Sequence, residues 1–442
     1  LYVDNDADQL GEYKGNSIEL GTPGKTGGIS YIDFHSESGA DYNSRIYVNG
    51  GDSGAGSGTM EFVAADIVFS SFPTTPSSAP TQNYDVANKK YVDDNAGGSL
   101  INVVDDYGAD NTGTTRADDK IQNAINAAAN NDIVYFPGGI YLIEATISIP
   151  SGKTVHLLGG ASFAAELRWH VNSVSDIMID MRAGGSATII DGLKFTDPSS
   201  GSTITAIYGG HTTECGSHVI RNCDFYGLYC GVDGGSGMST SYFAFFDSEI
   251  NNCAFISCTY GFKSCGTAVR INGGKFHTCT YGVWMGHENT ANKPGNFCYG
   301  VVWTQCTYDI YVATENPGIN AFIGCWFESS TGNILYANAG TRYFKRGFYF
   351  TNCQLNTADA GGDLIDITNV DGGNISIISC NIYDTAKDDI IIPSGVIYTQ
   401  LDLTGVSTGG TFTRYNDSLA SGISNYTNVT GGVGFETGWS DA

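Results

Sequence analysis

The sequence predicts an all-β protein whose largest part is a parallel β-helix, and three observations lead to that prediction. Glycine accounts for 59 of the 442 residues, and charged residues make up only 15%, against usual shares of roughly 7% and 25%. Aromatic residues reach 12%, which is too much apolar material for a disordered chain. A short phrase of apolar residues and cysteine recurs between residues 220 and 382. Low charge, many turns and a loose internal repeat are typical of a solenoid of β-strands.

The recurring phrase consists of an apolar residue, two others, a cysteine, one more residue and a second apolar residue. Its copies begin at Ile220, Ile250, Ile271, Trp303, Phe322, Phe350 and Ile377. Their cysteine positions hold Cys223, Cys253, Gly274, Cys306, Cys325, Cys353 and Cys380. The mean interval of about 26 residues fits coils of about 20 residues with loops of varying length. We therefore expect the cysteines to stack along the interior of the coils as small apolar side chains and to stay free thiols.

Further positions keep the same register. Leu228, Cys258 and Cys279 lie five residues after the cysteine position, and Gly231, Gly261 and Gly282 lie eight residues after it. Asn222, Asn252 and Asn352 directly precede the cysteine, where stacked amides can hydrogen-bond along a turn. The 12 cysteines contain no C-x-x-C pair, so a zinc ribbon is not predicted.

The chain is expected to have four parts. Residues 1–72 form a small N-terminal β domain, with strand signals at Ile29–Phe34, Arg45–Val48 and Met60–Phe69. Residues 73–100 form a linker that is rich in proline and contains a short helix at 85–93. The β-helix covers 101–395, and 396–442 form a small C-terminal β region.

The β-helix opens with a helix between strands. Strands are expected at Ile101–Val104, Ile133–Phe136 and Ile140–Ile143, and a helix at Arg116–Ala129. Thr114 or Thr115 is expected to cap this helix. Its apolar stripe consists of Ile121, Ala124, Ile125 and Ala128, which follow helical spacing.

The run DDYGADNTGTTRADDKIQNAINAAANNDIVYFPGGIYLI at residues 105–143 resembles the first segment of pectate-lyase-like right-handed β-helices, especially those of phage tailspikes. In that family the helix covers the N-terminal end of the solenoid, which implies the same handedness and cap here. The run SYIDFHSESGADYNSRIYVNGG at residues 30–51 is similar to β modules of phage tail fibres. The phrase ANKKYVDD at residues 87–94 is similar to the junction before their receptor-reading part.

The resemblance implies a tailspike of the virion tail that acts outside the host cell at the bacterial surface. It implies a parallel homotrimer whose N-terminal region joins the tail or baseplate and whose β-helix binds and depolymerises a capsule or O-antigen. A tail adhesin without chemistry and a polysaccharide lyase that acts by β-elimination are the alternatives, because the fold alone does not decide function. No cofactor is expected.

Alignment of the copies indicates where chemistry could lie. The residue three after the cysteine position is Tyr226, Ile256, His277, Asp309, Glu328, Asn356 and Tyr383 in successive copies. Since this position points outward and adjacent coils lie about 4.8 Å apart, Asp309 and Glu328 are expected to be neighbours. A carboxylate pair at that separation predicts glycoside hydrolysis. Trp326, His277 and Lys275 are expected to bind the sugar beside this catalytic pair.

Charge and missing motifs narrow the function. The formal net charge of −25 argues against binding to nucleic acid or to an anionic membrane. The sequence contains no metal-binding or nucleotide-binding motif, so no metal is expected. Elimination would need a stacked arginine or lysine beside a cation, and the expected face offers no stacked arginine, so hydrolysis is favoured. The competing carboxylates are Asp247, Glu249, Glu288, Glu315, Asp388 and Asp389.

Overall fold

The computed structural model describes the following residues. They are 99–160, 164–170, 176–199, 201–209, 215–235, 244–266, 268–286, 295–313, 318–337, 344–357, 364–367 and 372–383, with separate strands before residue 64 and after residue 389. The chain divides into two compact units, Leu1–Asn88 and Lys89–Ala442.

The first unit contains short antiparallel strands. β3 (Ser30–Phe34), β4 (Ser44–Asn49) and β5 (Thr59–Val63) form a sheet, and β1 (Glu12–Lys14) pairs with β2 (Ser17–Glu19). The strands β3, β4 and β5 lie where the sequence predicts strands. The predicted linker and its short helix at 85–93 lie outside the described residues.

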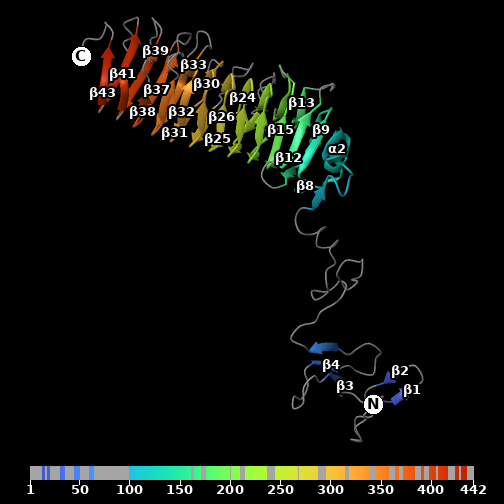
Figure 1. Ribbon diagram of the computed structural model, residues 1–442. Helices are drawn as coiled ribbons and strands as arrows, with labels where there is room; N and C mark the ends of the chain where they lie inside the picture. Colours follow the sequence, from blue (N-terminus) through green and yellow to red (C-terminus); the bar gives the residue numbers. More distant parts are fainter. Residues whose placement is uncertain are drawn as a thin grey trace. The chain divides into compact units, whose positions relative to one another are not determined.

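The second unit is the right-handed parallel β-helix that the sequence predicts, with strands stacked side by side in chain order (Figure 1). Each coil contributes strands to three faces. Face 1 is a sheet of 13 strands. They are β6 (Leu100–Asn102), β8 (Asp132–Phe136), β11 (Val155–Gly159), β14 (Ile189–Asp191), β18 (Val219–Arg221), β22 (Glu249–Asn251), β25 (Val269–Asn272), β28 (Asn296–Tyr299), β31 (Asn320–Ile323), β34 (Phe344–Thr351), β37 (Gly372–Ile378), β40 (Tyr398–Thr404) and β42 (Ser424–Thr427).

Faces 2 and 3 join in one further sheet. Face 2 comprises β7 (Thr112–Arg116), β9 (Gly139–Ile143), β12 (Ala165–Trp169), β15 (Leu193–Thr196), β19 (Asp224–Tyr226), β23 (Ala254–Ile256), β26 (Lys275–His277), β29 (Val302–Thr304), β32 (Trp326–Ser330), β35 (Gln354–Thr357), β38 (Asn381–Tyr383), β41 (Ser407–Asn416) and β43 (Thr430–Phe435). Face 3 comprises β10 (Ile147–Ser148), β13 (Ile177–Asp180), β16 (Thr205–Tyr208), β20 (Cys230–Asp233), β24 (Tyr260–Ser264), β27 (Tyr281–Met285), β30 (Tyr308–Val312), β33 (Asn333–Ala337), β36 (Ile365–Asp366) and β39 (Ile390–Ile392). A separate pair, β17 (Cys215–Gly216) and β21 (Ala244–Phe246), is also parallel.

The parallel stacking extends beyond the boundary predicted at residue 395. β40 pairs with β37 and β42, and β41 pairs with β38, β39 and β43, all in parallel register. The parallel pairing therefore continues to β43, which ends at Phe435. The cysteine phrase stops earlier because backbone hydrogen bonds make the pairing and do not require that side chain.

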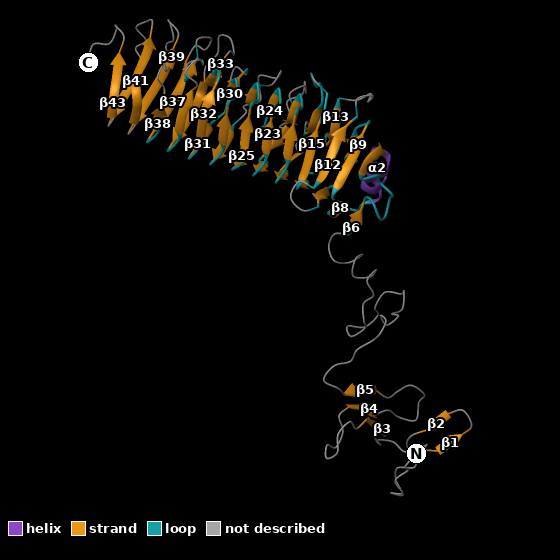
Figure 2. Cartoon of the chain, viewed as in Figure 1, coloured by secondary structure: helices purple, strands orange, loops and turns teal. Residues whose placement is uncertain are grey.

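The helix α2 (Asp118–Ala127) lies at the N-terminal end of the solenoid, as predicted, and is the one helix among the described residues (Figure 2). Its stripe of Ile121, Ala124 and Ile125 is fully buried. The Gln122 side chain holds it to β10, because its amide donates to the Ser148 carbonyl at 2.9 Å and its carbonyl accepts from the Ser148 N–H at 2.7 Å.

The predicted threonine cap of this helix is wrong. The cap residue is Ala117, which makes no side-chain capping bond. Thr114 and Thr115 lie in β7 instead, and their hydroxyls donate to Asp110 at 2.9 and 3.0 Å. Hydrogen bonds from Thr112 and its neighbours hold the pKa of Asp110 below its usual value. The local carboxylate thus competes successfully for the hydroxyls that could have capped the helix.

A column of aromatic rings fills the interior along face 2. Phe195, Phe225, Phe255, Phe276, Trp303 and Phe327 stack in that order with centroids 4.5–5.4 Å apart and planes within 11°. All six side chains are buried. Gly231 and Gly261 leave room for this column, because an added Cβ would lie 2.6 and 2.5 Å from the rings of Phe255 and Phe276.

The cysteines form two interior ladders, in the two registers that the sequence indicates. Cys223, Cys253, Cys325 and Cys353 donate to the carbonyls of Ile190, Ile220, Cys298 and Phe322 on face 1. Cys258, Cys279 and Cys306 donate to the carbonyls of Phe225, Phe255 and Phe276 on face 2. Cys306 therefore belongs to the second ladder, although the sequence assigns it to the first. The eleven cysteines whose side chains are described are buried, free thiols, as expected.

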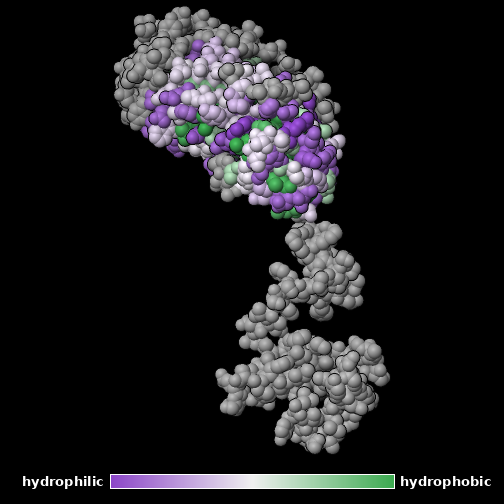
Figure 3. Space-filling view, turned by 45° about the vertical axis from the view of Figure 1, so that its right-hand side comes forward, coloured by the Kyte–Doolittle hydropathy of each residue, from purple (hydrophilic) through white to green (hydrophobic). Residues whose placement is uncertain are grey.

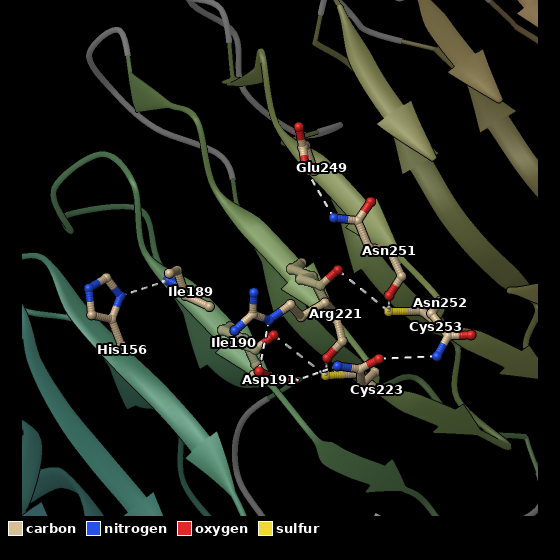
Figure 4. A network of polar contacts seen from close by, with 12 residues as sticks. His156, Ile189, Ile190, Asp191, Arg221, Cys223, Glu249, Asn251, Asn252 and Cys253 are labelled. Atoms are coloured by element: carbon tan, nitrogen blue, oxygen red, sulfur yellow. Dashed lines mark hydrogen bonds and ion pairs between the residues drawn. The ribbon is translucent and has the colours of Figure 1, made fainter. Parts of the chain in front are cut away.

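The predicted asparagine ladder lies at the tight turn between faces 1 and 2 (Figure 4). The Asn252 amide donates to the Asn222 amide oxygen at 3.0 Å, and the Asn222 amide donates to Asp191 at 2.9 Å. Both asparagines have positive φ, 52° and 51°. Asparagine tolerates this left-handed conformation better than most residues, so one residue type serves both the turn and the ladder.

Candidate functional site

The coil that contains Trp303 does not have the register that the sequence predicts. The backbone of Trp303 pairs with Phe276 and with Phe327, so Trp303 occupies the second apolar position of the phrase. The residue that follows, Thr304, pairs with His277 and Glu328. Because cysteine fits both interior turns and Trp fits the same column as Phe, the sequence alone allowed a shift by five residues.

Asp309 consequently lies on face 3 and not beside Glu328. It occupies the inward position that Gly282 holds one coil earlier, and its side chain is fully buried. The Ser330 hydroxyl donates to its Oδ2, and no described residue bonds Oδ1. Burial raises the pKa of Asp309 well above its usual value. The prediction of an outward Asp309–Glu328 pair is therefore wrong, and a buried Asp309 cannot contact a polymer.

The other predicted site residues lie on the outside of face 2. Glu328 and His277 share one row, separated by Thr304 on the coil between them. Trp326 and Lys275 share the neighbouring row, separated by Val302. Two coils correspond to about 10 Å, so these four side chains share a face but do not form one contact cluster. Trp326 is 45% exposed, which leaves its ring accessible to a ligand.

Face 3 carries an aromatic surface that the sequence reasoning missed. We define the aromatic surface as Tyr229, Tyr260, Tyr281, Tyr308, Trp284, Tyr311 and Tyr336, all of which are half-buried. The backbones of Tyr260, Tyr281 and Tyr308 are partners on successive coils, and those of Trp284, Tyr311 and Tyr336 form the next outward row. The repeated dipeptide at Thr259-Tyr260, Thr280-Tyr281 and Thr307-Tyr308 is the signal that could have revealed it.

The rings of the first row stack on one another. Centroids of Tyr260 and Tyr281 lie 4.8 Å apart with planes at 14°, and those of Tyr281 and Tyr308 lie 5.5 Å apart with planes at 11°. Tyr311 meets Tyr281 and Tyr308 at 72° and 69°. Burial raises the pKa of Tyr260 to about 12, so its hydroxyl remains a donor at neutral pH. The surface therefore combines apolar ring area with phenol hydroxyls.

Among the described residues, Lys263 contacts rings of the aromatic surface, and Arg182 contacts Tyr208 on the same face. Each of these two cations is paired with a carboxylate. The Lys263 ammonium lies 4.4 Å from the centroid of Tyr260 and 4.7 Å from that of Tyr229, and 3.6 Å from the Asp233 carboxylate. Its side chain is only 11% exposed. Arg182 lies 5.3 Å from the Tyr208 ring and forms an ion pair with Asp180. The positive charges of these two side chains are thus paired with carboxylates of the same face.

The predicted residues and the aromatic surface meet at one corner of the β-helix. His277 ends its face 2 strand four residues before Tyr281, and Thr304 ends its strand four residues before Tyr308. Glu328 lies in β32, five residues before the start of β33. His277, Glu328 and the first row of tyrosines therefore flank the same turn between faces 2 and 3.

A second polar cluster lies nearer the N-terminal end of face 2. Glu166 accepts hydrogen bonds from Arg168 at 2.7 Å, Thr196 at 2.8 Å and Lys194 at 3.1 Å. Burial acts to raise the pKa of Glu166, but these bonds outweigh it and lower the pKa. Burial raises the pKa of Asp224, whose backbone pairs with that of Lys194. The cluster escaped the sequence reasoning because the cysteine phrase begins only at Ile220.

Other kinds of site receive no support from the described part of the chain. No group of three or more His, Cys, Asp and Glu side chains there could hold a metal ion. No helix in that part is long and apolar enough to cross a membrane. The described residues on the side drawn in Figure 3 mix hydrophilic and hydrophobic character, with small apolar patches.

Comparisons with known proteins agree with this fold. Residues 100–188 match the sequence model of the family described as rhamnogalacturonase A/epimerase, pectate lyase-like. The catalytic unit of a GH87 α-1,3-glucanase from Streptomyces thermodiastaticus aligns over 96% of this chain and 83% of its own, with 13% identity and a TM-score of 0.51. The Agl-KA catalytic domain aligns over 88% and 73%, with 12% identity and a TM-score of 0.51.

The tailspike of the Acinetobacter phage vB_ApiP_P1 aligns over 76% of this chain and 60% of its own, with 12% identity and a TM-score of 0.44. No curated protein matches the chain in sequence. The family match begins at the first strand of the solenoid and includes α2. The resemblance to pectate-lyase-like β-helices, which residues 105–143 carry in the sequence, is thus confirmed over residues 100–188.

Proposed function

We propose that this protein is a phage tailspike that binds a bacterial surface polysaccharide, a capsule or O-antigen, and depolymerises it outside the host cell. The aromatic surface is the observation that carries the proposal. Phenol and indole rings pack against the apolar faces of sugars, and their polar groups bond sugar hydroxyls. The pectate lyase-like match over residues 100–188 supports a polysaccharide ligand.

Attachment and assembly follow from the resemblance of the N-terminal region to tail fibres. We expect residues 30–51 and 87–94 to belong to the part that joins the tail or baseplate, and the β-helices to associate as a parallel homotrimer. Sedimentation equilibrium of the full chain is expected to give three times the monomer mass. A stable monomer across the accessible concentration range would contradict this assembly.

Hydrolysis is the proposed reaction, with Glu328 as general acid. Glu328 would protonate the glycosidic oxygen as the C–O bond breaks, while water adds to the anomeric carbon and loses its proton to a second carboxylate. Asp309 is too deeply buried to be that second group. Glu288, four residues after Trp284 in the sequence, is the candidate, and it lies outside the described residues. Trp326 and His277 are proposed to hold the sugar beside Glu328. Lys275, which lies in β26 together with His277, is proposed to bind it two coils from Trp326 and Glu328.

Replacing Glu328 by glutamine keeps the side-chain shape and removes the ionisable group. We expect Glu328→Gln to lower the rate of depolymerisation by at least ~10²-fold, with binding of the polysaccharide unchanged. Asp224→Asn is the matched control, because Asp224 is a half-buried outward carboxylate of the same face. Loss of cleavage in Asp224→Asn with full activity in Glu328→Gln would indicate that the reaction takes place at the cluster around Glu166.

The function itself is tested by incubating the full chain with a panel of purified capsular polysaccharides and O-antigens. Binding is measured by affinity electrophoresis and polymer length by gel filtration. The depolymerase predicts that a bound polymer becomes shorter. A polymer that is bound but keeps its length would identify the tail adhesin. The burial of Asp309 favours that alternative, because it removes the predicted catalytic pair. Products with an unsaturated uronate would identify a lyase.

A further inference from the structure

The first row of the aromatic surface presents hydroxyls rather than open ring faces. Tyr260, Tyr281 and Tyr308 stack with planes within 14°, so each ring covers the face of its neighbour. The hydroxyls of Tyr281 and Tyr308 form no hydrogen bond with a described residue and are not among the buried polar atoms. What this row offers a ligand is a line of phenol O–H groups that can donate and accept.

These hydroxyls repeat along the axis of the β-helix with the spacing of the coils. Successive rings are 4.8 and 5.5 Å apart. That step is close to the length of one pyranose unit in an extended glycan. A polysaccharide that lies parallel to the axis can therefore place one sugar residue beside each tyrosine. Trp284, Tyr311 and Tyr336 flank the row with rings inclined to it at 82°, 72° and 36°, and they supply apolar contact.

The charge around this row is unfavourable for a polyanion. Within the described part of the chain, Lys263 and Arg182 are the cations that contact aromatic rings of this face, and each is paired with a carboxylate, Asp233 or Asp180. Asp366 follows Tyr336 in the same outward row. The chain as a whole carries a formal net charge of −25. Bringing a chain of uronates, sialic acids or phosphates to this surface would therefore meet repulsion, and the two described cations of this face are already paired with carboxylates.

From these observations we infer that the aromatic surface recognises an uncharged polysaccharide, which runs parallel to the β-helix axis and bonds the hydroxyls of Tyr281 and Tyr308. The inference rests on the proposed function and names the substrate class of the same site. It also agrees with hydrolysis, because β-elimination needs a uronate and an uncharged glycan has none.

The test compares the full-length wild type with the double variant Tyr281→Phe/Tyr308→Phe, which keeps the ring stack and removes only the two hydroxyls. Tyr226→Phe is the control, because Tyr226 is 51% exposed on face 2 and lies outside the aromatic surface. Circular dichroism and thermal melting check that all three proteins fold alike. Binding is measured against purified capsular polysaccharides and O-antigens that are grouped by charge, at low and high salt.

We expect the tightest ligand to be uncharged and its affinity to change little with salt. The double variant should lose about ten-fold in affinity for it, and Tyr226→Phe should bind like the wild type. A polyanion as the tightest ligand, or wild-type affinity in the double variant, would overturn the inference while the proposed function stands. Failure to bind any polysaccharide in the panel would count against both.

Discussion

Replacing Trp303 by alanine is expected to lower the free energy of unfolding by roughly 3–5 kcal/mol. Trp303 is fully buried in the interior column, stacked between Phe276 at 5.4 Å and Phe327 at 4.5 Å. Removing the indole deletes contacts with the rings of both adjacent coils and opens a cavity that the parallel strands cannot close. Chemical denaturation monitored by far-ultraviolet circular dichroism measures the change, provided that unfolding is reversible.

Trp303→Phe is the matched control for this prediction. The neighbouring coils hold Phe276 and Phe327 at the same position, so phenylalanine fits the column. It also removes an indole N–H that has no hydrogen-bond partner among the described residues. We expect the loss in Trp303→Phe to stay below about 1.5 kcal/mol. Equal losses in both variants would contradict the stacked column.

The second large effect concerns Asp309 and pH. Burial raises the pKa of Asp309 in the folded state, whereas in the unfolded chain it should be near 4. Between these two values the folded state holds one more proton than the unfolded state. The free energy of unfolding should therefore fall by about 1.4 kcal/mol per pH unit as the pH rises above ~4, until the folded pKa is passed.

Asp309→Asn removes this titration and retains a similar shape. We expect the variant to gain stability relative to the wild type as the pH rises from 4 toward neutrality, and to show no such gain at pH 3, where both states of the wild type are protonated. Denaturation midpoints across this range measure the difference. A difference in stability that stays constant at all pH values would show that the pKa of Asp309 is the same in the folded and unfolded states.

The sequence predicted the fold well because repeated interior positions leave a strong signal. The cysteine phrase identifies coils, and the glycines at 231 and 261 mark places where a stacked ring leaves no room for a Cβ. The run at residues 105–143 placed α2 at the end of the solenoid. The predicted N-terminal cap of α2 was wrong because Asp110 accepts hydrogen bonds from the hydroxyls of Thr114 and Thr115. Helix propensity does not include this local competition.

The candidate site was harder to predict than the fold. Which outward side chains become neighbours on adjacent coils depends on the register of every coil. One shift at Trp303 moved Asp309 from the outside of face 2 to the interior of face 3. Cys306 caused the shift, because cysteine suits both interior turns and so does not distinguish them. The tyrosines of the aromatic surface were visible in the sequence, but partners on adjacent coils became neighbours only through the pairing of β24, β27 and β30.

A polysaccharide is proposed to bind along the aromatic surface of face 3. The most direct measurement is a crystal structure of the full chain with an oligosaccharide prepared from the polymer that it binds. We expect sugar residues in line with the β-helix axis, within hydrogen-bonding distance of the hydroxyls of Tyr281 and Tyr308 and near Glu328. An oligosaccharide bound on face 1, or at the cluster around Glu166, with the aromatic surface empty, would contradict it.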